Sequence, residues 1–508
     1  MAELDVFLQS FGSLSLFGAL LVLLLVLVIF PSSFGSKKPR NEPPGPTPLP
    51  LIGNLLQIDM WNRHKSLQKF YKKYGSVFTI YMGPKKMVVL AGYKTVKEAL
   101  VNYADEFGER EELCVPWIIL YNYCLSGVLW SNGDSWKEMR RFSLINLRDY
   151  GMGKKACEDK IIEESFYLTE ELKKFKGDQL LTNAVSNIIS SMVYGSRFDY
   201  EDPEFILTMK NVEWKYKDQS NLILLLQQFY NVFPAIGKWF SGAQKEFQKL
   251  QVLLREYNFK VFRQLRETLN PHMCRGFVDA FFVRQQQQLK ESGVIDRHYN
   301  DANLEETIKH LFGGGTETTA TTLRWILLFM IKYPKIQDQI QEEISRVVGS
   351  RKLQYEDRNN LPFTNAVIHE TQRLANVFPM SIPHRTSKDV TFQGYFIEKG
   401  TVVIPLLGSV LYDETEWEKP HSFHPAHFLD KDGKFVKRDA FMPFSAGRRV
   451  CLGEGLARME LFLFFTTLLQ NFRLTPPPGV SEDDLDLTPQ LLAPLSPRPY
   501  KLCIVPRT

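Results

Sequence analysis

The sequence predicts a mainly α-helical protein with a minor β part, in which one large domain follows a single membrane-spanning helix at the amino terminus. Helical spacing of apolar residues dominates the chain after residue 50, whereas only short segments have the character of strands. No linker, repeat or low-complexity block divides residues 51–508. A length of 508 residues would by itself favour about three domains, but the lack of a linker argues for one.

Residues 1–36 are predicted to form a membrane anchor. No charged residue occurs from Val6 to Ser36, and the run Leu14–Phe30 is almost entirely apolar. Together with the residues just before it, this run is long enough to cross a bilayer core as a helix. A cleaved signal peptide is the alternative, but the run is long for one and acidic residues precede it. The basic residues that follow predict a cytosolic body; they are Lys37, Lys38 and Arg40.

Residues 37–50 are predicted to be a hinge between the anchor and the domain. The segment Pro43–Pro50 is rich in proline, which fixes φ and removes a hydrogen-bond donor. We therefore expect a stiff, extended spacer that sets how the domain leans on the bilayer. A proline-rich ligand for a signalling domain is the alternative interpretation.

Within the domain, three segments have clear secondary-structure patterns. Ser76–Leu90 predicts two strands around a Gly-Pro turn, and Tyr395–Pro405 predicts a second small β element. Ile336–Val348 has the spacing of a helix.

Composition excludes several classes of protein. The charges nearly balance, with 62 basic and 57 acidic residues, and no dense basic stripe occurs, so nucleic acid is not an expected partner. The six cysteines lie far apart and form no Cys-x-x-Cys pair, which argues against a disulfide scaffold and against a structural zinc site.

The strongest chemical signal is the segment Phe444–Gly453. Its cysteine, Cys451, has glycines close by on both sides, where backbone could approach a flat ligand. Arg448 and Arg449 precede the cysteine, and helix-forming residues follow it. Positive charge and a helix amino terminus both predict a lowered thiol pKa, and a thiolate in such a setting can be an axial ligand of haem iron.

This segment has two other interpretations. The first is an inert buried cysteine. The second is a dinucleotide-binding loop, which fails because Gly453-x-Gly455 lacks the third glycine and follows no strand.

The segment Phe444–Gly453 also matches the pattern Phe-x-x-Gly-x-Arg-x-Cys-x-Gly at every fixed position. It thereby resembles the haem-ligand signature of the cytochromes P-450, and three further matches occur in the order of that family. The chain looks most like the microsomal family-2 type, which handles drugs, fatty acids and other lipophiles. The resemblance implies the cytochrome P-450 fold, an endoplasmic-reticulum membrane location and haem b bound by Cys451, with Phe444 and Gly453 in the binding loop.

The second signal is Gly313–Thr319, which lies in a long helical pattern from Leu304 to Lys332. Each glycine costs about 1 kcal/mol relative to alanine inside a helix, so something should compensate. Glu317 and Thr318 form an acid–alcohol pair that could pass protons, and a threonine bonded back to its own helix is the alternative. The resemblance implies that Thr318, with Glu317 beside it, delivers protons to activated dioxygen. Gly314 stands where the family usually has alanine, and we expect it to influence how the substrate sits.

The third signal is the pair Glu370 and Arg373, which three-residue spacing places on one face of a helix. The resemblance implies a buried structural pair that holds the fold around the cysteine loop. The usual third partner is an arginine in a Pro-Glu-Arg-Phe segment. Here that segment reads Pro-Ala-His-Phe, and His427 replaces the arginine, which leaves the third partner open.

The fourth signal is Trp136 and Arg140, which lie four residues apart and therefore on one helical face. An indole N–H and a guanidinium suit a carboxylate, although core packing is the alternative for the tryptophan. The resemblance implies that the carboxylate is a haem propionate, with Arg449, His384 and Arg110 as further partners.

The resemblance also implies an apolar pocket for a lipophilic small molecule. Any of its candidate residues could equally belong to the core; they are Leu113, Val115, Trp117, Leu222–Leu226, Gly314, Phe378, Pro379 and Met380. Aromatic residues in the region 222–240 favour contact with the bilayer surface over plain core packing.

No flavin or ferredoxin module is visible, so electrons should come from another protein. We expect an NADPH-dependent flavoprotein reductase, with cytochrome b5 as an additional partner. The residues of this chain that we predict to dock the reductase are basic, namely Lys137, Arg141, Lys434, Lys437, Arg438 and Arg448. The predicted activity is that of a haem-thiolate monooxygenase that inserts one oxygen atom into a xenobiotic, fatty acid or steroid. The alternatives are a haem-thiolate isomerase or dehydratase that does not use dioxygen, and a non-catalytic membrane-bound carrier.

Overall fold

The computed structural model describes residues 41–111, 127–151, 155–174, 179–216, 242–490 and 494–507. The predicted anchor, the substrate candidates Leu113, Val115 and Trp117, and the predicted bilayer-contact region 222–240 lie outside these residues. Across the described ranges, no helix combines the length and the apolar character needed to cross a membrane.

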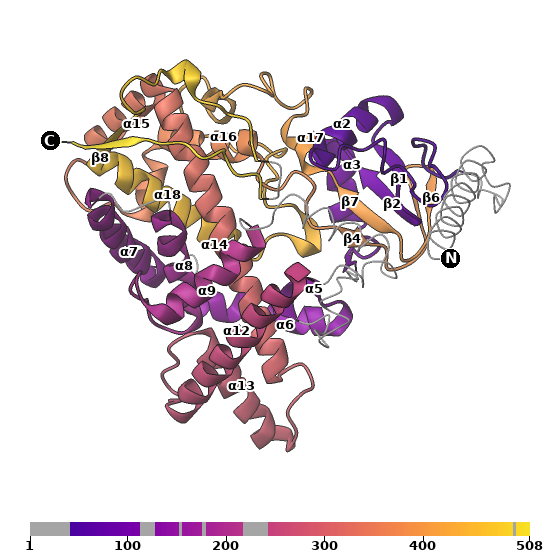
Figure 1. The fold of residues 1–508 in the computed structure, drawn as a ribbon, viewed down its shortest axis with the longest axis horizontal. Coiled ribbons are helices and arrows are strands. Elements are labelled where there is room, and N and C mark those ends of the chain that lie inside the picture. Colours follow the sequence, from indigo (N-terminus) through magenta and orange to yellow (C-terminus); the bar gives the residue numbers. More distant parts are fainter. Residues whose placement is uncertain are drawn as a thin grey trace, which may run out of the picture.

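The prediction of a mainly helical protein with a minor β part is confirmed (Figure 1). Amphipathic helices bury their apolar faces against one another in a large core. The helices outside the centre of the body are α2 (Arg63–Tyr74), α3 (Tyr93–Lys97), α5 (Gly127–Trp130), α6 (Gly133–Asp149), α7 (Lys155–Lys173), α8 (Leu180–Val193), α9 (Pro203–Tyr216), α12 (Gly242–Glu267), α13 (Phe277–Ser292), α15 (Pro334–Val347), α16 (Pro362–Ala375) and α17 (Leu407–Leu411).

A five-stranded sheet lies beside the helical body, at the right of Figure 1. Its order is β1-β2-β7-β4-β3, and β2 and β7 are its parallel pair. The strands are β1 (Val77–Met82), β2 (Lys85–Leu90), β3 (Glu109–Arg110), β4 (His384–Arg385) and β7 (Val402–Pro405). Two smaller sheets pair β5 (Val390–Phe392) with β6 (Tyr395–Ile397), and β8 (Phe472–Thr475) with β9 (Cys503–Pro506).

The predicted hairpin over residues 76–90 is confirmed as β1 and β2. The predicted element over residues 395–405 is also β structure, but it is divided between two sheets. Its first half is β6, and its second half, β7, joins the large sheet beside β2. A period-two pattern identifies strands but not their partners, because pairing is a long-range choice.

The helix α14 (Asp301–Lys332) runs through the middle of the helical body (Figure 1). Asn300 caps its amino terminus by accepting the Asn303 N–H at 2.9 Å. Packing against a neighbouring helix explains one of the glycines in α14. A Cβ at Gly315 would lie 2.5 Å from the Cδ1 atom of Ile189 in α8, so a small residue permits these two helices to pack closely.

The helix α18 (Glu454–Asn471) is almost entirely buried and packs against α14, α7 and α15. It begins three residues after Cys451, which agrees with the predicted helix amino terminus next to that cysteine.

The described part of the proline-rich segment is extended and lies against β1. The Thr79 N–H donates to the Pro44 carbonyl at 2.7 Å. A Cβ at Gly45 would lie 2.0 Å from the Thr79 carbonyl oxygen, so glycine permits this close approach. These contacts attach residues 44 and 45 to the body of the domain.

Candidate active site

The cysteine loop is closed by its own backbone. The Cys451 N–H donates to the Phe444 carbonyl at 3.0 Å. Gly447 has φ 72°, and a Cβ there would lie 1.7 Å from the Leu100 carbonyl oxygen, so only glycine fits. Ser445 also lies in the left-handed region, at φ 63°. The packed, strained loop presents one side chain, Cys451, at a defined place before α18.

The structure corrects the predicted direction of the Cys451 pKa. Burial raises this pKa above its ordinary value, although the N–H groups of Gly453 and Glu454 and the charge of Arg140 act to lower it. Burial dominates because a thiolate loses hydration that these groups do not fully replace. The predicted neighbour Arg448 forms an ion pair with Asp105.

Cys451 nevertheless has an exposed side-chain surface. Cys451 therefore lies deep among protein atoms, which raises its pKa, but it borders space that the described residues do not fill. This argues against an inert cysteine packed into the core. After Cys451 in the chain, Gly453 and Gly455 have no atom within 4 Å of where a Cβ would stand.

Four buried side-chain nitrogen atoms near this loop have no hydrogen-bond partner among the described residues. They are Trp136 Nε1, Arg110 Nε, His384 Nε2 and Arg449 Nη1. Buried polar groups are normally satisfied, so the three N–H donors among these atoms, on Trp136, Arg110 and Arg449, indicate a missing acceptor.

The fold brings these donors together from four separate segments. Arg110 in β3 and His384 in β4 are direct partners in the sheet register. The guanidinium of Arg449 lies 3.9 Å from the centre of the Trp136 ring in α6. The His384 Nδ1 atom lies 2.7 Å from the Phe107 carbonyl, so the proton of the neutral ring is on Nδ1 and is donated there. Nε2 donates to a carboxylate only when the ring is protonated, and a nearby carboxylate favours that form.

The lowered pKa values in this cluster also favour the binding of an anion. Burial and then the charge of Arg140 lower the pKa of Arg110 to about 9. Burial and then the charges of Arg110 and Arg140 lower the pKa of Arg449 to about 8. The pKa of His384 is lowered well below its usual range by burial and by Arg110. A carboxylate would relieve this repulsion and accept charge-assisted hydrogen bonds.

Arg140, predicted with this group, donates to the Val450 carbonyl at 2.7 Å and thereby ties α6 to the cysteine loop. Phe444 is half-buried at the start of that loop.

Asn132 belongs to the same site but was not anticipated from the sequence. Its Oδ1 atom accepts from the Arg110 N–H at 2.7 Å and from Arg449 Nη2 at 2.9 Å, and its Nδ2 atom donates to the Arg110 carbonyl at 2.9 Å. The local signal, an asparagine just before a helix, indicates only a cap. The structure shows no side-chain cap there, because the amide instead binds the backbone of Arg110 and the guanidinium of Arg449.

Thr318 lies in the middle of α14. Its hydroxyl donates to the Gly314 carbonyl at 2.6 Å, which is the back-bonded alternative considered above. A hydroxyl that donates one hydrogen bond still has lone pairs with which to accept another. Gly314 is exposed, and nothing lies within 4 Å of where its Cβ would stand, so this turn of an otherwise buried helix borders open space.

Glu317 is not part of a direct acid–alcohol pair with Thr318. Its buried carboxylate forms an ion pair with Arg324 at 2.9 Å and accepts from the Thr321 hydroxyl at 3.2 Å. Adjacent residues on a helix point in different directions, and residues three, four or seven apart share a face. The side chains of Glu317 and Thr318 therefore do not form the predicted acid–alcohol pair.

The Glu370–Arg373 pair is fully buried, with side chains 0% exposed. Two parallel hydrogen bonds of 2.8 Å join the guanidinium to the carboxylate. The remaining guanidinium contacts go to backbone carbonyls of the segment that precedes the cysteine loop, namely those of Leu411, Pro420 and Ser422.

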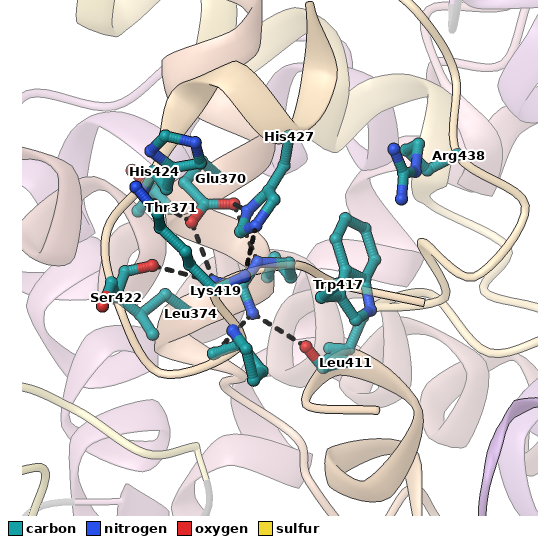
Figure 2. A network of polar contacts seen from close by, with 12 residues as sticks. Glu370, Thr371, Leu374, Leu411, Trp417, Lys419, Ser422, His424, His427 and Arg438 are labelled. Atoms are coloured by element: carbon teal, nitrogen blue, oxygen red, sulfur yellow. Dashed lines mark hydrogen bonds and ion pairs between the residues drawn. The ribbon is translucent and has the colours of Figure 1, made fainter. Parts of the chain in front are cut away.

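His427 is the third partner that the sequence left open (Figure 2). The Lys419 N–H donates to His427 Nε2 at 3.2 Å, so the ring proton is on Nδ1 and is donated to the Glu370 carboxylate at 3.1 Å. Glu370 also accepts the His424 N–H at 2.8 Å. A neutral histidine thus takes the place expected for an arginine.

The substrate candidates among the described residues have different surroundings. Met380 packs against the small core cluster beside β1, as the core alternative predicted, and Pro379 is buried. Phe378 is half-buried, and Gly314 borders open space.

Among the basic residues predicted to dock a reductase, Lys137, Arg141, Lys434 and Lys437 are exposed. Arg448 pairs with Asp105, and Arg438 donates to the Glu416 carbonyl at 2.5 Å. Lys137 and Arg141 also form ion pairs, with Asp134 at 3.2 Å and with Glu138 at 3.0 Å. Four of the six basic residues are therefore held by groups of the chain itself.

Fold and site together define a class of protein. A thiol borders open space, a long helix has an exposed glycine one turn before a half-buried threonine, and buried donors lack an acceptor among the described residues. This donor set fits the two acidic side chains of a haem, and a cysteine thiolate fits its iron.

The comparisons with known proteins agree with this class. The family model "Cytochrome P450" matches residues 43–504. The chain is 57% identical to cytochrome P450 2K1 of Oncorhynchus mykiss over the full length of both chains. It is 50% identical to cytochrome P450 2K6 of Danio rerio over 91% of this chain and 90% of that one. It is 45% identical to cytochrome P450 2F2 of Mus musculus over 91% of this chain and 93% of that one.

The chain therefore belongs to the cytochrome P450 family, and within it to family 2. Membership makes it a monooxygenase of lipophilic small molecules, with haem held by a cysteine thiolate and with electrons supplied by a reductase. The comparisons support neither the isomerase or dehydratase alternative nor the carrier alternative.

Proposed function

We propose that Cys451 is the thiolate ligand of the haem, and that Trp136, Arg110, His384 and Arg449 hold its propionates. The observation that carries this proposal is a set of buried side-chain nitrogens next to the Cys451 loop that have no partner among the described residues: the donors of Trp136, Arg110 and Arg449, and the Nε2 atom of His384. Arg140 supports the arrangement by tying α6 to the cysteine loop, and Asn132 supports it by joining the backbone of Arg110 to the guanidinium of Arg449.

When bound, the haem supplies the activation of dioxygen with two electrons from the reductase. The chain supplies the electron-rich sulfur of Cys451, the charge that neutralises the propionates, and a hydroxyl at Thr318 for proton transfer. Glu317, held by Arg324, has the role of ordering this part of α14 rather than of touching Thr318. Cytochrome b5 is an additional electron donor in this proposal.

The role of Thr318 can be tested by substitution. In Thr318→Ala, the acceptor hydroxyl is lost, so we expect the yield of product per NADPH oxidised to fall by about 10²-fold, in the range of general acid–base effects. Reductant use should continue and release reduced oxygen species. Thr318→Ser, which keeps the hydroxyl, should retain most of the yield. The measurement is product by mass spectrometry against NADPH oxidation in the presence of reductase, and an unchanged yield in Thr318→Ala would contradict the role.

The substrate class in this proposal is a lipophilic xenobiotic, fatty acid or steroid. The open space beside Gly314 gives such a molecule room next to Thr318. A panel of lipophiles incubated with the reductase-coupled protein would rank these classes directly.

We further propose that residues 1–36 anchor the protein in the endoplasmic-reticulum membrane, with the body in the cytosol. The long uncharged run and the basic residues after it support this topology.

Deletion of residues 1–36 tests the anchor. The full chain should float with vesicles in a density gradient and resist extraction by alkaline carbonate, whereas the truncated chain should be extractable. Truncated protein that resists carbonate as fully as the intact chain would contradict the anchor. Truncated protein that leaves the vesicles completely would count against bilayer contact by the region 222–240.

A further inference from the structure

His369 lies on α16 directly before Glu370 and belongs to a second network, separate from the Glu370–Arg373–His427 network. Three phenyl rings surround its imidazole, with centroid distances of 5.4, 4.6 and 4.9 Å to Phe428, Phe435 and Phe441. Both ring nitrogens have polar partners. Nδ1 lies 2.7 Å from the Asn365 carbonyl, and Nε2 lies 2.8 Å from Arg458 Nη1.

These contacts define the state of the imidazole. A guanidinium can only donate, so Nε2 is an acceptor and the ring proton is on Nδ1, where it is donated to Asn365. Burial and then the charge of Arg458 lower the pKa of His369 to about 3, which agrees with a neutral ring.

Arg458 joins His369 to the first turn of α18. Its Nε and Nη2 atoms donate to Glu454 Oε1 at 3.0 and 2.8 Å. Its guanidinium also lies 5.1 Å from the centre of the Phe444 ring, at the start of the cysteine loop. With Nη1 on His369, the arginine contacts α16, α18 and the cysteine loop at once.

Glu454 lies where it affects the sulfur. Its backbone N–H and that of Gly453 are hydrogen-bonded to Cys451. Hydrogen bonds to a ligating sulfur, and the orientation of the groups that make them, tune a metal centre from outside its ligand set. The Glu454 carboxylate is an unfavourable neighbour for a thiolate, and Arg458 compensates its charge.

We propose that His369 is a positioning residue for the haem thiolate: by accepting the Arg458 N–H, it holds Arg458 on Glu454 and so keeps the N–H groups of Gly453 and Glu454 directed at the Cys451 sulfur. This inference rests on the proposed role of Cys451 as the ligand. The acceptor at position 369, rather than the bulk of the ring, therefore protects the thiolate.

Two substitutions of His369 separate these properties. His369→Phe preserves an aromatic ring among the three phenyl groups but removes the acceptor. His369→Gln loses the ring but keeps an acceptor that can reach Arg458. The full-length, haem-loaded protein is reduced and treated with carbon monoxide, and the loss of its thiolate-type absorption is followed over time, together with haem content and the midpoint of thermal unfolding.

We expect the thiolate-type absorption to be lost about tenfold faster in His369→Phe than in the original protein, as for the loss of one charge-assisted hydrogen bond. The thermal midpoint should change little in this variant. His369→Gln should lose the absorption at close to the original rate, even if its thermal midpoint falls. The reverse order, with the phenylalanine variant unchanged and the glutamine variant impaired, would overturn the inference in favour of ring packing.

A second comparison separates the loss of the acceptor in His369→Phe from a general folding defect of that variant. In an Arg458→Met background the arginine is already gone, so adding His369→Phe should cause no further acceleration, whereas the same acceleration as in the original background would overturn the inference. The parent proposal fails separately, because in that case the original protein itself would show no thiolate-type absorption.

Discussion

Cys451→Ser is expected to abolish turnover, by on the order of 10³-fold or more, as when a catalytic group is removed outright. A serine hydroxyl is a far poorer donor to iron than a thiolate, so the electron density that favours O–O cleavage is lost. The buried donors that we assign to the propionates remain, so the variant should still take up haem. The ferrous protein treated with carbon monoxide should then lack the thiolate-type absorption shift.

Cys503→Ser is the matched control for this substitution. Cys503 is half-buried in β9, away from the glycine-rich loop, and has no assigned role. It should keep both the absorption shift and the turnover. If Cys451→Ser also kept them, the ligand would have to be another residue, and the interpretation of the open space beside Cys451 would be wrong.

Glu370→Gln is expected to lower the free energy of unfolding by about 3–5 kcal/mol, the cost of leaving one member of a buried ion pair without its partner. Arg373 would remain at 0% exposure with its carbonyl contacts but without a counter-charge. His427 would lose its charged acceptor as well. Because Arg373 binds carbonyls on both sides of Pro420, we also expect a looser segment before the cysteine loop and a lower haem content. Urea denaturation and the ratio of haem to protein measure the two effects.

The control for this prediction is Glu170→Gln. Glu170 and Lys173 have the same three-residue spacing on a helix as Glu370 and Arg373, with a distance of 2.7 Å, but their side chains are 41% and 50% exposed. An exposed pair of this kind contributes at most about 1 kcal/mol. Equal losses of stability in the two variants would show that burial is not what makes the Glu370 pair important.

Several features were predictable because their signals are local. The hairpin β1–β2 follows from two apolar strands around a Gly-Pro turn, and α14 follows from helical spacing over many residues. The position of Cys451 before a helix follows in the same way from helix-forming residues after a glycine. Each of these depends on residues close together in the chain, so the pattern carries the information.

Other features depend on contacts that no local pattern reports. Asn132 has the sequence context of a helix cap, but its amide binds the backbone of Arg110 and the guanidinium of Arg449, which are 22 and 317 residues away. The His427 contact to Glu370 spans 57 residues. Glu317 has Thr318 as its chain neighbour, yet its carboxylate pairs with Arg324 on the next turns of the helix.

The sequence by itself determined the class of this protein, since ten residues around Cys451, a glycine-rich helix and a Glu-x-x-Arg pair are contiguous or closely spaced signals. Only the tertiary structure decided how the site is charged. Burial of Cys451, the mutual repulsion of Arg110 and Arg449, and the unpaired donors between β3, β4 and α6 arise when distant segments exclude water together. Desolvation is a property of the assembled surroundings of a group and not of its neighbours in the chain, which is why the expected lowering of the Cys451 pKa was wrong while the identification of the residue rested on its sequence pattern.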